Sequence, residues 1–183
     1  MTTLRQATTP EDIAAARALF VEYAAWLDVD LCFQGFDEEL ATLPGAYAPP
    51  QGRLLLAGGP GGPIGCIALR PLDANPGHGG DTEAAAQVTG EVKRLYVRPE
   101  CRNGGWGRKL AEALLDEARA IGYRELKLDT LEWMTSARRL YASLGFAECA
   151  PYYRNPLPGV VYMACKLEKT GSEKMGSDPI QGT

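Results

Sequence analysis

A short glycine-rich turn between an apolar strand and an amphipathic helix constrains the fold of this chain most. The turn, Arg102-Asn103-Gly104-Gly105-Trp106-Gly107, follows an apolar run at 91–97 and precedes a helical pattern at 108–121. Glycines let several backbone N–H groups converge without interference from Cβ atoms. The start of the helix adds unpaired N–H donors and the positive end of the helix dipole. The segment therefore predicts either an anion cradle suited to a pyrophosphate or a tight turn without a ligand.

Length, charge and cysteine content limit the remaining choices. A chain of 183 residues is expected to form one domain, which we place at 1–168, followed by a polar tail at 169–183. The formal net charge of −4 argues against nucleic-acid binding. No apolar run approaches the ~20 residues that span a bilayer, so no membrane association is expected. Five scattered cysteines without a C-x-x-C pair indicate reduced thiols in a cytoplasmic protein, and a single histidine, His78, argues against a metal site.

Hydrophobic periodicity predicts an alternation of helices and strands. Helices are expected from Pro10 through Trp26, from Asp37, and over 108–121 and 133–144. Strands are expected over 53–57, 64–69, 91–97 and 126–130, from 146, and over 160–167. The order α-α-β-β-β-α-β-α-β-β implies an α/β domain with a mixed central sheet and helices on both faces. The Pro- and Gly-rich stretch 71–90 is expected to be a flexible connection.

Two blocks of this sequence resemble one known family. The strand and Arg-x-x-Gly-x-Gly turn within 92–107 resemble the acetyl-CoA signature of the GNAT superfamily of N-acetyltransferases. The run ARRLYASLGF at 137–146 resembles the A-x-x-L-Y-x-x-x-G-F block of the same superfamily. The resemblance covers 53–167 and implies a GNAT-like fold, with a mixed sheet splayed at the cofactor strand. Met134 departs from the pattern, because many relatives carry Asn there, and this puts one side-chain contact to the cofactor in doubt.

The resemblance implies that acetyl-CoA is held mostly by backbone groups. The N–H of Leu95 would face the thioester carbonyl as an oxyanion donor, and the backbone of Val97 would pair with the pantetheine arm. Arg102 occupies the Arg/Gln position of the signature. The amides that would hold the pyrophosphate belong to Asn103, Gly105, Gly107 and Arg108.

Two side chains are candidates for acid–base catalysis. Tyr141 matches the family's frequent general acid, because a phenol can hydrogen-bond or protonate a thiolate leaving group; the alternative is a tyrosine packed in the core. Glu91 matches a position where some relatives place a general base, and the alternative is a surface carboxylate. Glu91 and Leu95 are about 13 Å apart on an extended strand. Direct proton abstraction by Glu91 would therefore need a bulge or a water chain, and Asp129 is a second candidate.

The resemblance implies an N-acetyltransferase that moves an acetyl group from acetyl-CoA to a primary amine by direct transfer in a ternary complex. The acceptor would be a small molecule or a peptide, and homodimers are common in this family. Transfer of another acyl group and a non-catalytic acyl-CoA-binding sensor stay open as alternatives. The acceptor would enter between two loops that carry Trp26, Phe33, Phe36, Tyr152, Tyr153, Arg154 and Asn155. The alternative, which we favour for the two phenylalanines, is that the aromatic residues belong to the core and its rim, and a loop arginine such as Arg154 is more often a solvated charge.

Overall fold

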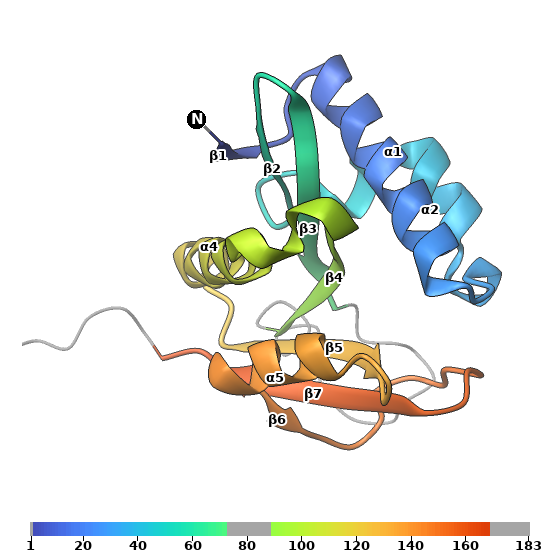
Figure 1. The fold of residues 1–183 in the computed structure, drawn as a ribbon. Helices are drawn as coiled ribbons and strands as arrows, with labels where there is room; N and C mark the ends of the chain where they lie inside the picture. Colours follow the sequence, from blue (N-terminus) through green and yellow to red (C-terminus); the bar gives the residue numbers. More distant parts are fainter. Residues whose placement is uncertain (1, 73–88, 169–183) are drawn as a thin grey trace, which may run out of the picture.

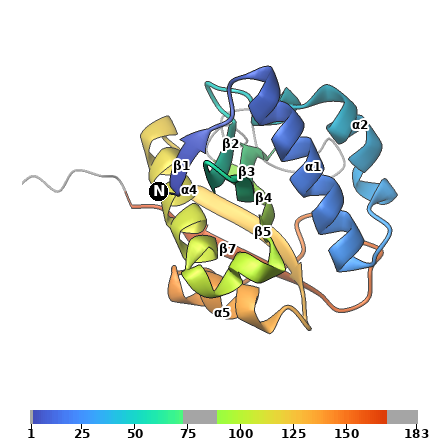
Figure 2. The ribbon, with the colours of Figure 1, turned by 45° about the horizontal axis from the view of Figure 1, so that its top comes forward.

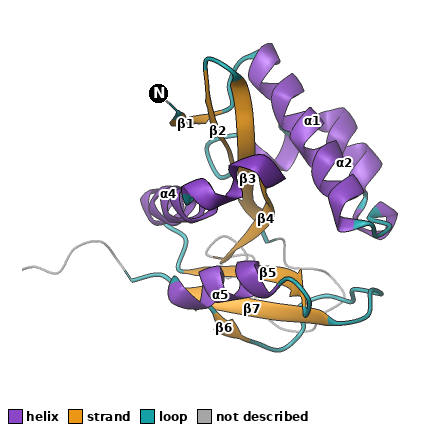
Figure 3. Ribbon diagram, in the orientation of Figure 1, coloured by secondary structure: helices purple, strands orange, loops and turns teal. Residues whose placement is uncertain are grey.

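The computed structural model describes residues 2–72 and 89–168, which fold around a seven-stranded mixed sheet (Figure 3). The strands are β1 (Thr3–Gln6), β2 (Arg53–Gly59), β3 (Gly62–Pro71), β4 (Thr89–Val97), β5 (Glu125–Leu131), β6 (Ala147–Glu148) and β7 (Val160–Lys166). The α-helices are α1 (Pro10–Leu27), α2 (Phe36–Thr42), α4 (Trp106–Ile121) and α5 (Thr135–Ser143). Three 3₁₀ helices, η1 (Cys32–Gln34), η2 (Gly45–Tyr47) and η3 (Pro99–Gly104), complete the order.

Helix α1 begins at Pro10 and α4 ends at Ile121, as the sequence predicts, whereas α1 extends to Leu27 and α4 already begins at Trp106. The hydroxyl of Thr9 accepts a hydrogen bond of 3.1 Å from the backbone N–H of Asp12, which caps the N-terminus of α1. At the C-terminus of α4, Gly122 adopts φ 107°, and its N–H bonds back to the carbonyl of Ala118. A left-handed residue after the last turn is a common helix stop, because only glycine takes that conformation without a Cβ penalty.

The sheet is divided by the divergence of its two central strands. Its order is β1-β2-β3-β4-β5-β7-β6, and among the strands of residues 2–72 and 89–168 only β4 and β5 are parallel neighbours. Their register joins Thr89, Gly90 and Glu91 to residues 125–127 and then stops, although both strands continue. Figure 1 shows the two halves of the sheet running in different directions beyond that point. The expected mixed sheet is therefore confirmed, with an open edge on β4.

Helices cover both faces of the sheet, as the element order predicts (Figure 2). Helices α4 and α5 bury one core, in which Leu69, Leu114 and Leu126 are fully inaccessible or nearly so. Helices α1 and α2 bury the other core around Leu19 and Phe20. Burial of such apolar side chains on both faces stabilises the sheet between them.

The structure differs from the sequence-based elements at several places. The N-terminal strand β1, which pairs with β2, is not predicted from the sequence, because four residues with three polar side chains carry no clear pattern. Helix α5 begins at Thr135 instead of Trp133, since the N–H of Met134 bonds to the carbonyl of Leu131 in a turn. Most of the predicted connection 71–90, including His78, and the predicted tail 169–183 lie outside the described residues.

Candidate active site

A β-bulge in the middle of β4 shapes the site. Ala68 of β3 lies opposite Lys93, and Cys66 lies opposite Tyr96, so β4 contains one residue more than its partner in this interval. Arg94 in the bulge adopts φ 59°. A left-handed backbone at a non-glycine residue costs on the order of 1–3 kcal/mol and persists only when its surroundings hold it.

The side chain of Arg94 makes contacts that stabilise this left-handed backbone conformation. Its guanidinium makes a two-pronged ion pair with Glu39 of α2, in which Nε donates to Oε1 over 3.0 Å. The same guanidinium lies 5.0 Å from the ring centroid of Phe36. The Arg94 side chain is only 3% exposed. A buried ion pair thus ties the bulge to α2.

Leu95, which follows Arg94, leaves the regular ladder on both sides of β4. The register with β3 passes over Leu95, and the register with β5 ends at Glu91. Bulges re-aim the backbone and the side chains next to them. The backbone at Leu95 therefore occupies a special position, which is the one the resemblance assigns to an oxyanion donor.

A groove of about 480 Å³ runs along the open edge of β4. Its walls come from β4, the glycine turn, the end of α1 and the start of α5. Among the predicted cofactor residues, those that line the groove are Leu95, Val97, Arg102, Asn103 and Gly107. Gly105 and Arg108 flank Gly107 and are not among its lining residues. Trp26 also lines it, and the Arg102 guanidinium lies 4.3 Å from the Trp26 ring centroid.

The glycine turn and the start of α4 suit an anion. Gly105 is the N-cap residue with φ 70°, a conformation that favours glycine. No acidic residue of the first turn of α4 occupies its free N–H groups. A Cβ on Gly107 would meet only Leu140 Cδ2, at 3.8 Å. The first N–H groups of α4 therefore form an environment that suits an anion, and Arg108 adds a cation nearby.

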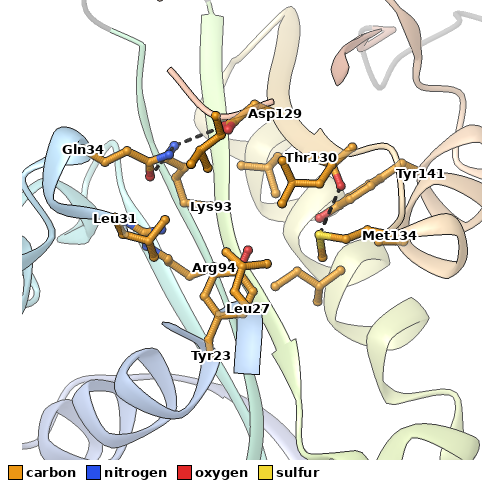
Figure 4. Close-up of a pocket in the computed structure, with 15 residues that line it drawn as sticks. Tyr23, Leu27, Leu31, Gln34, Lys93, Arg94, Asp129, Thr130, Met134 and Tyr141 are labelled. Atoms are coloured by element: carbon orange, nitrogen blue, oxygen red, sulfur yellow. Dashed lines mark hydrogen bonds and ion pairs between the residues drawn. The ribbon is translucent and has the colours of Figure 1, made fainter. Parts of the chain in front are cut away.

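A buried cavity of about 60 Å³ lies beside the groove (Figure 4). We call it the inner cavity, and its lining residues come from α1, η1, β4, β5, α5 and the segment before β7. Leu95, Met134 and Ala137 line both the groove and the inner cavity. The two spaces therefore meet at the bulge of β4 and the start of α5.

Tyr141 lines the inner cavity from α5. Its ring packs edge-on against Phe146 with centroids 5.3 Å apart, and the residue is 6% exposed. Burial raises the pKa of the phenol well above its usual value near 10, and the nearby Tyr23 and Asp129 raise it further. The Tyr141 phenol is consequently neutral and protonated at physiological pH. Tyr141 thus combines a ring packed in the core with a position on the wall of the inner cavity, so the two alternatives given for this residue are compatible.

Glu91 is buried rather than at the surface, because it is 1% exposed. Its carboxylate lies 2.7 Å from Arg70 Nη2 and 3.3 Å from Lys93 Nζ, and it accepts a hydrogen bond of 3.0 Å from the Tyr152 hydroxyl. Glu91 is not among the residues that line the inner cavity. The interpretation of Glu91 as a surface carboxylate is thus wrong for this structure.

Asp129 of β5, the second candidate base, does line the inner cavity. One carboxylate oxygen lies 3.2 Å from Lys93 Nζ, and the other accepts a hydrogen bond of 3.0 Å from Asn155 Nδ2. Lys93 Nζ therefore bridges Asp129 and Glu91, and it also donates to Gln34 Oε1 over 3.4 Å. The side chain of Lys93 is 7% exposed.

Sequence reasoning missed several residues of the inner cavity, namely Tyr23, Gln34, Lys93 and Thr130. Their positions depend on helix–sheet packing and on the bulge, neither of which leaves a local sequence signal. Several residues of the two loops considered for the acceptor have structural partners instead. Phe36 packs in the core under Arg94, as favoured from the sequence, and Tyr152 bonds to Glu91. The Tyr153 hydroxyl accepts a long hydrogen bond of 3.4 Å from Gln34 Nε2. Arg154 is exposed, and the side chain of Phe33 lies outside the described part of the structure.

Within residues 2–72 and 89–168, no group of three or more His, Cys, Asp or Glu side chains could hold a metal ion. No helix in the same ranges has the length and apolar character needed to cross a membrane.

Comparison with known proteins identifies relatives of this chain. Residues 17–146 match the sequence model of the acetyltransferase (GNAT) family. An uncharacterised N-acetyltransferase of Schizosaccharomyces pombe is 38% identical over 161 residues, covering 87% of this chain and 91% of the relative. A GNAT acetyltransferase structure from Staphylococcus aureus has a TM-score of 0.71 at 17% identity, covering 92% of this chain and 100% of that chain.

A Salmonella typhimurium structure, which contains its cofactor acetyl-CoA, has a TM-score of 0.68 at 22% identity. The structural match covers 96% of this chain and 99% of the Salmonella chain. These structures share the fold, including the mixed sheet described above. The family match spans most of the chain and includes both sequence blocks that resemble the superfamily. The chain belongs to the GNAT family of acetyltransferases and is an acyltransferase enzyme.

Proposed function

We propose that this enzyme transfers the acetyl group of acetyl-CoA directly to a primary amine in a ternary complex. One observation carries the proposal: the groove on the open edge of β4 meets the inner cavity at Leu95, Met134 and Ala137. One ligand in each space would place two reactants side by side at the bulge. Holding two reactants in this way supplies much of the rate enhancement of a group transfer.

The groove is the proposed site of acetyl-CoA. The N–H groups at the start of α4 and the turn residues Asn103, Gly105 and Gly107 would hold the diphosphate, with Arg102 and Arg108 nearby. The edge of β4 at Val97 would run along the pantetheine arm. When bound, acetyl-CoA supplies an acyl carbon open to attack by an amine and a thiol as leaving group.

The residues at the junction have distinct proposed roles. The N–H of Leu95, displaced from the ladder by the bulge, would donate a hydrogen bond to the carbonyl oxygen of the thioester. Tyr141 would donate its proton to the departing sulfur, for which a neutral phenol is required. Asp129 would accept the proton of the attacking amine, and Glu91 would support Asp129 through Lys93. No cysteine lines the groove or the inner cavity in the described chain, which favours direct transfer.

Isothermal titration with acetyl-CoA tests the groove. We expect saturable binding by the wild type and by Gly107→Ala, because a methyl group at residue 107 makes only an ordinary contact with Leu140. Gly107→Trp should abolish binding, because the indole would enter the groove. The alanine variant is the matched control for any effect of losing glycine in the helix.

Turnover is measured as CoA release in the presence of primary amines. We expect amine-dependent release by the wild type and none by Gly107→Trp. Equal binding by all three proteins would show that the coenzyme lies elsewhere. Binding without release by any amine would leave a coenzyme site but overturn acetyl transfer to amines.

A further inference from the structure

We infer that the acceptor is a small monoamine whose remaining part is apolar and uncharged. This inference rests on the proposed function, and it concerns the inner cavity alone. Three observations carry it: the balance of charge around the cavity, the shortage of free hydrogen-bond donors there, and the apolar walls.

The charged side chains around the inner cavity neutralise one another. Lys93, Arg94 and Asp129 line it, and Glu39, Glu91 and Arg70 are their direct ion-pair partners. This set holds three cations and three anions within the described chain. A second charge on an acceptor would therefore enter a space lined mostly by buried residues without a free counter-charge, which is unfavourable.

The cations of the cavity are already paired with carboxylates. An ammonium group has three donors, and Lys93 Nζ contacts Asp129, Glu91 and Gln34 within 3.4 Å. Arg94 donates from Nε and Nη2 to the two oxygens of Glu39, which uses two of its five donors. A carboxylate on the acceptor would thus compete with an existing anion for either cation.

The carboxylate of Asp129 can still accept a hydrogen bond from one amine. Its partners in the structure are Lys93, Asn155 and the Tyr153 hydroxyl, and a carboxylate has about four acceptor positions. Figure 4 shows Asp129, Lys93 and Gln34 grouped on one side of the cavity, with Met134 and Tyr141 across from them. Asp129 can therefore accept a hydrogen bond from one amine nitrogen of the acceptor.

Much of the remaining wall of the cavity is aliphatic, and its polar groups are the hydroxyls of Tyr23, Thr130 and Tyr141. The aliphatic residues include Leu27, Leu31, Val92, Leu131, Met134 and Leu157. A volume of about 60 Å³ accommodates a short substituent only. The aliphatic part of the wall favours an alkyl or aryl group over a polar one, because it offers no hydrogen bonds in exchange for those lost to water.

A matched set of three four-carbon amines tests the inference. The probes are n-butylamine, 1,4-diaminobutane and 4-aminobutanoate, which differ only in the group at the far end. We expect kcat/KM for n-butylamine to exceed that for each of the other two by about tenfold or more. The assay is CoA release at saturating acetyl-CoA, with the acetylated product identified by mass spectrometry.

An isosteric variant tests the charge argument. Gln34→Glu adds one negative charge beside Lys93 Nζ and the Tyr153 hydroxyl without changing side-chain length. We expect it to reduce the preference for n-butylamine over 1,4-diaminobutane by about fivefold. Gln51→Glu, an exposed position in the segment before β2, makes the same change in net charge and should leave the preference unchanged.

The outcomes separate this inference from the proposed function. A preference for n-butylamine that Gln34→Glu weakens and Gln51→Glu does not supports the inference. Efficient transfer to 1,4-diaminobutane or 4-aminobutanoate in preference to n-butylamine overturns it while leaving amine acetylation intact. A preference that Gln34→Glu does not change also overturns it. No CoA release with any of the three amines, in protein that binds acetyl-CoA, counts against both.

Discussion

The phenol of Tyr141 has the properties that proton donation to a thiolate requires. Its ring is packed against Phe146, so the hydroxyl is held in one place on the inner cavity. Burial raises its pKa, so the proton is present throughout the physiological range. A protonated phenol in a fixed position can donate a hydrogen bond to a thiolate, although the raised pKa makes it a weaker acid than a free phenol.

Replacing Tyr141 by phenylalanine keeps the ring and removes only the hydroxyl. We expect kcat to fall by about 10²-fold, while acetyl-CoA affinity and the melting temperature stay close to those of the wild type. Steady-state kinetics with titration calorimetry measure these quantities. Full turnover by Tyr141→Phe would remove Tyr141 from the mechanism.

The same residue shows how far sequence reasoning reaches at the scale of single side chains. Tyr141 stands in a recognisable block, and its placement on a cavity agrees with that block. Glu91 also matched the family pattern, but its environment was not predictable. Its partners Arg70, Lys93 and Tyr152 come from three different segments, and no local spacing relates them.

At the scale of elements, the bulge of β4 is the decisive feature. It displaces Leu95 from the sheet, and the ion pair between Arg94 and Glu39 secures it to α2. Burial works to raise the pKa of Glu39, but the hydrogen bond and charge of Arg94 outweigh it, and the pKa is lowered from its usual value near 4.5. The ionised form of Glu39 is therefore favoured by folding.

This shift has a defined consequence for stability. Because the folded pKa is below the unfolded one, the contribution of Glu39 is complete above about pH 4.5 and is lost as the pH falls through the lower, folded value. We expect Glu39→Gln to lower the free energy of unfolding at pH 7 by about 3 kcal/mol. The difference from the wild type should shrink at pH 3.

Urea denaturation at the two pH values measures this effect. Glu38→Gln, at the adjacent exposed position, is the matched control and should behave like the wild type. A Glu39→Gln protein as stable as the wild type at pH 7 would mean that the bulge does not depend on the ion pair.

At the scale of the whole molecule, one sheet joins two hydrophobic cores. The core under α4 and α5 and the core under α1 and α2 lie on opposite faces of the same strands, as Leu55 and Leu56 of β2 illustrate. Successive residues of a strand point to opposite faces, so neither core can be lost without exposing the strands of the other. We expect the two cores to unfold together.

Two variants, one in each core, test this cooperativity. Leu19→Ala in α1 and Leu114→Ala in α4 should each lower the free energy of unfolding by about 2–5 kcal/mol. Circular dichroism and tryptophan fluorescence should report a single coincident urea transition in each variant. Two separate transitions would show that the faces fold independently.

The sequence by itself determined the helices, most of the strands, the glycine turn and the family. These features depend on contacts within a few residues, such as the cap of α1, the stop at Gly122 and the alternation of apolar positions, and such contacts are visible in local spacing. Only the tertiary structure decided the bulge at Arg94, the burial of Glu91 and the meeting of the groove with the inner cavity. The physical reason is that strand register and buried ion pairs join residues far apart in the chain, and packing of the whole molecule selects them.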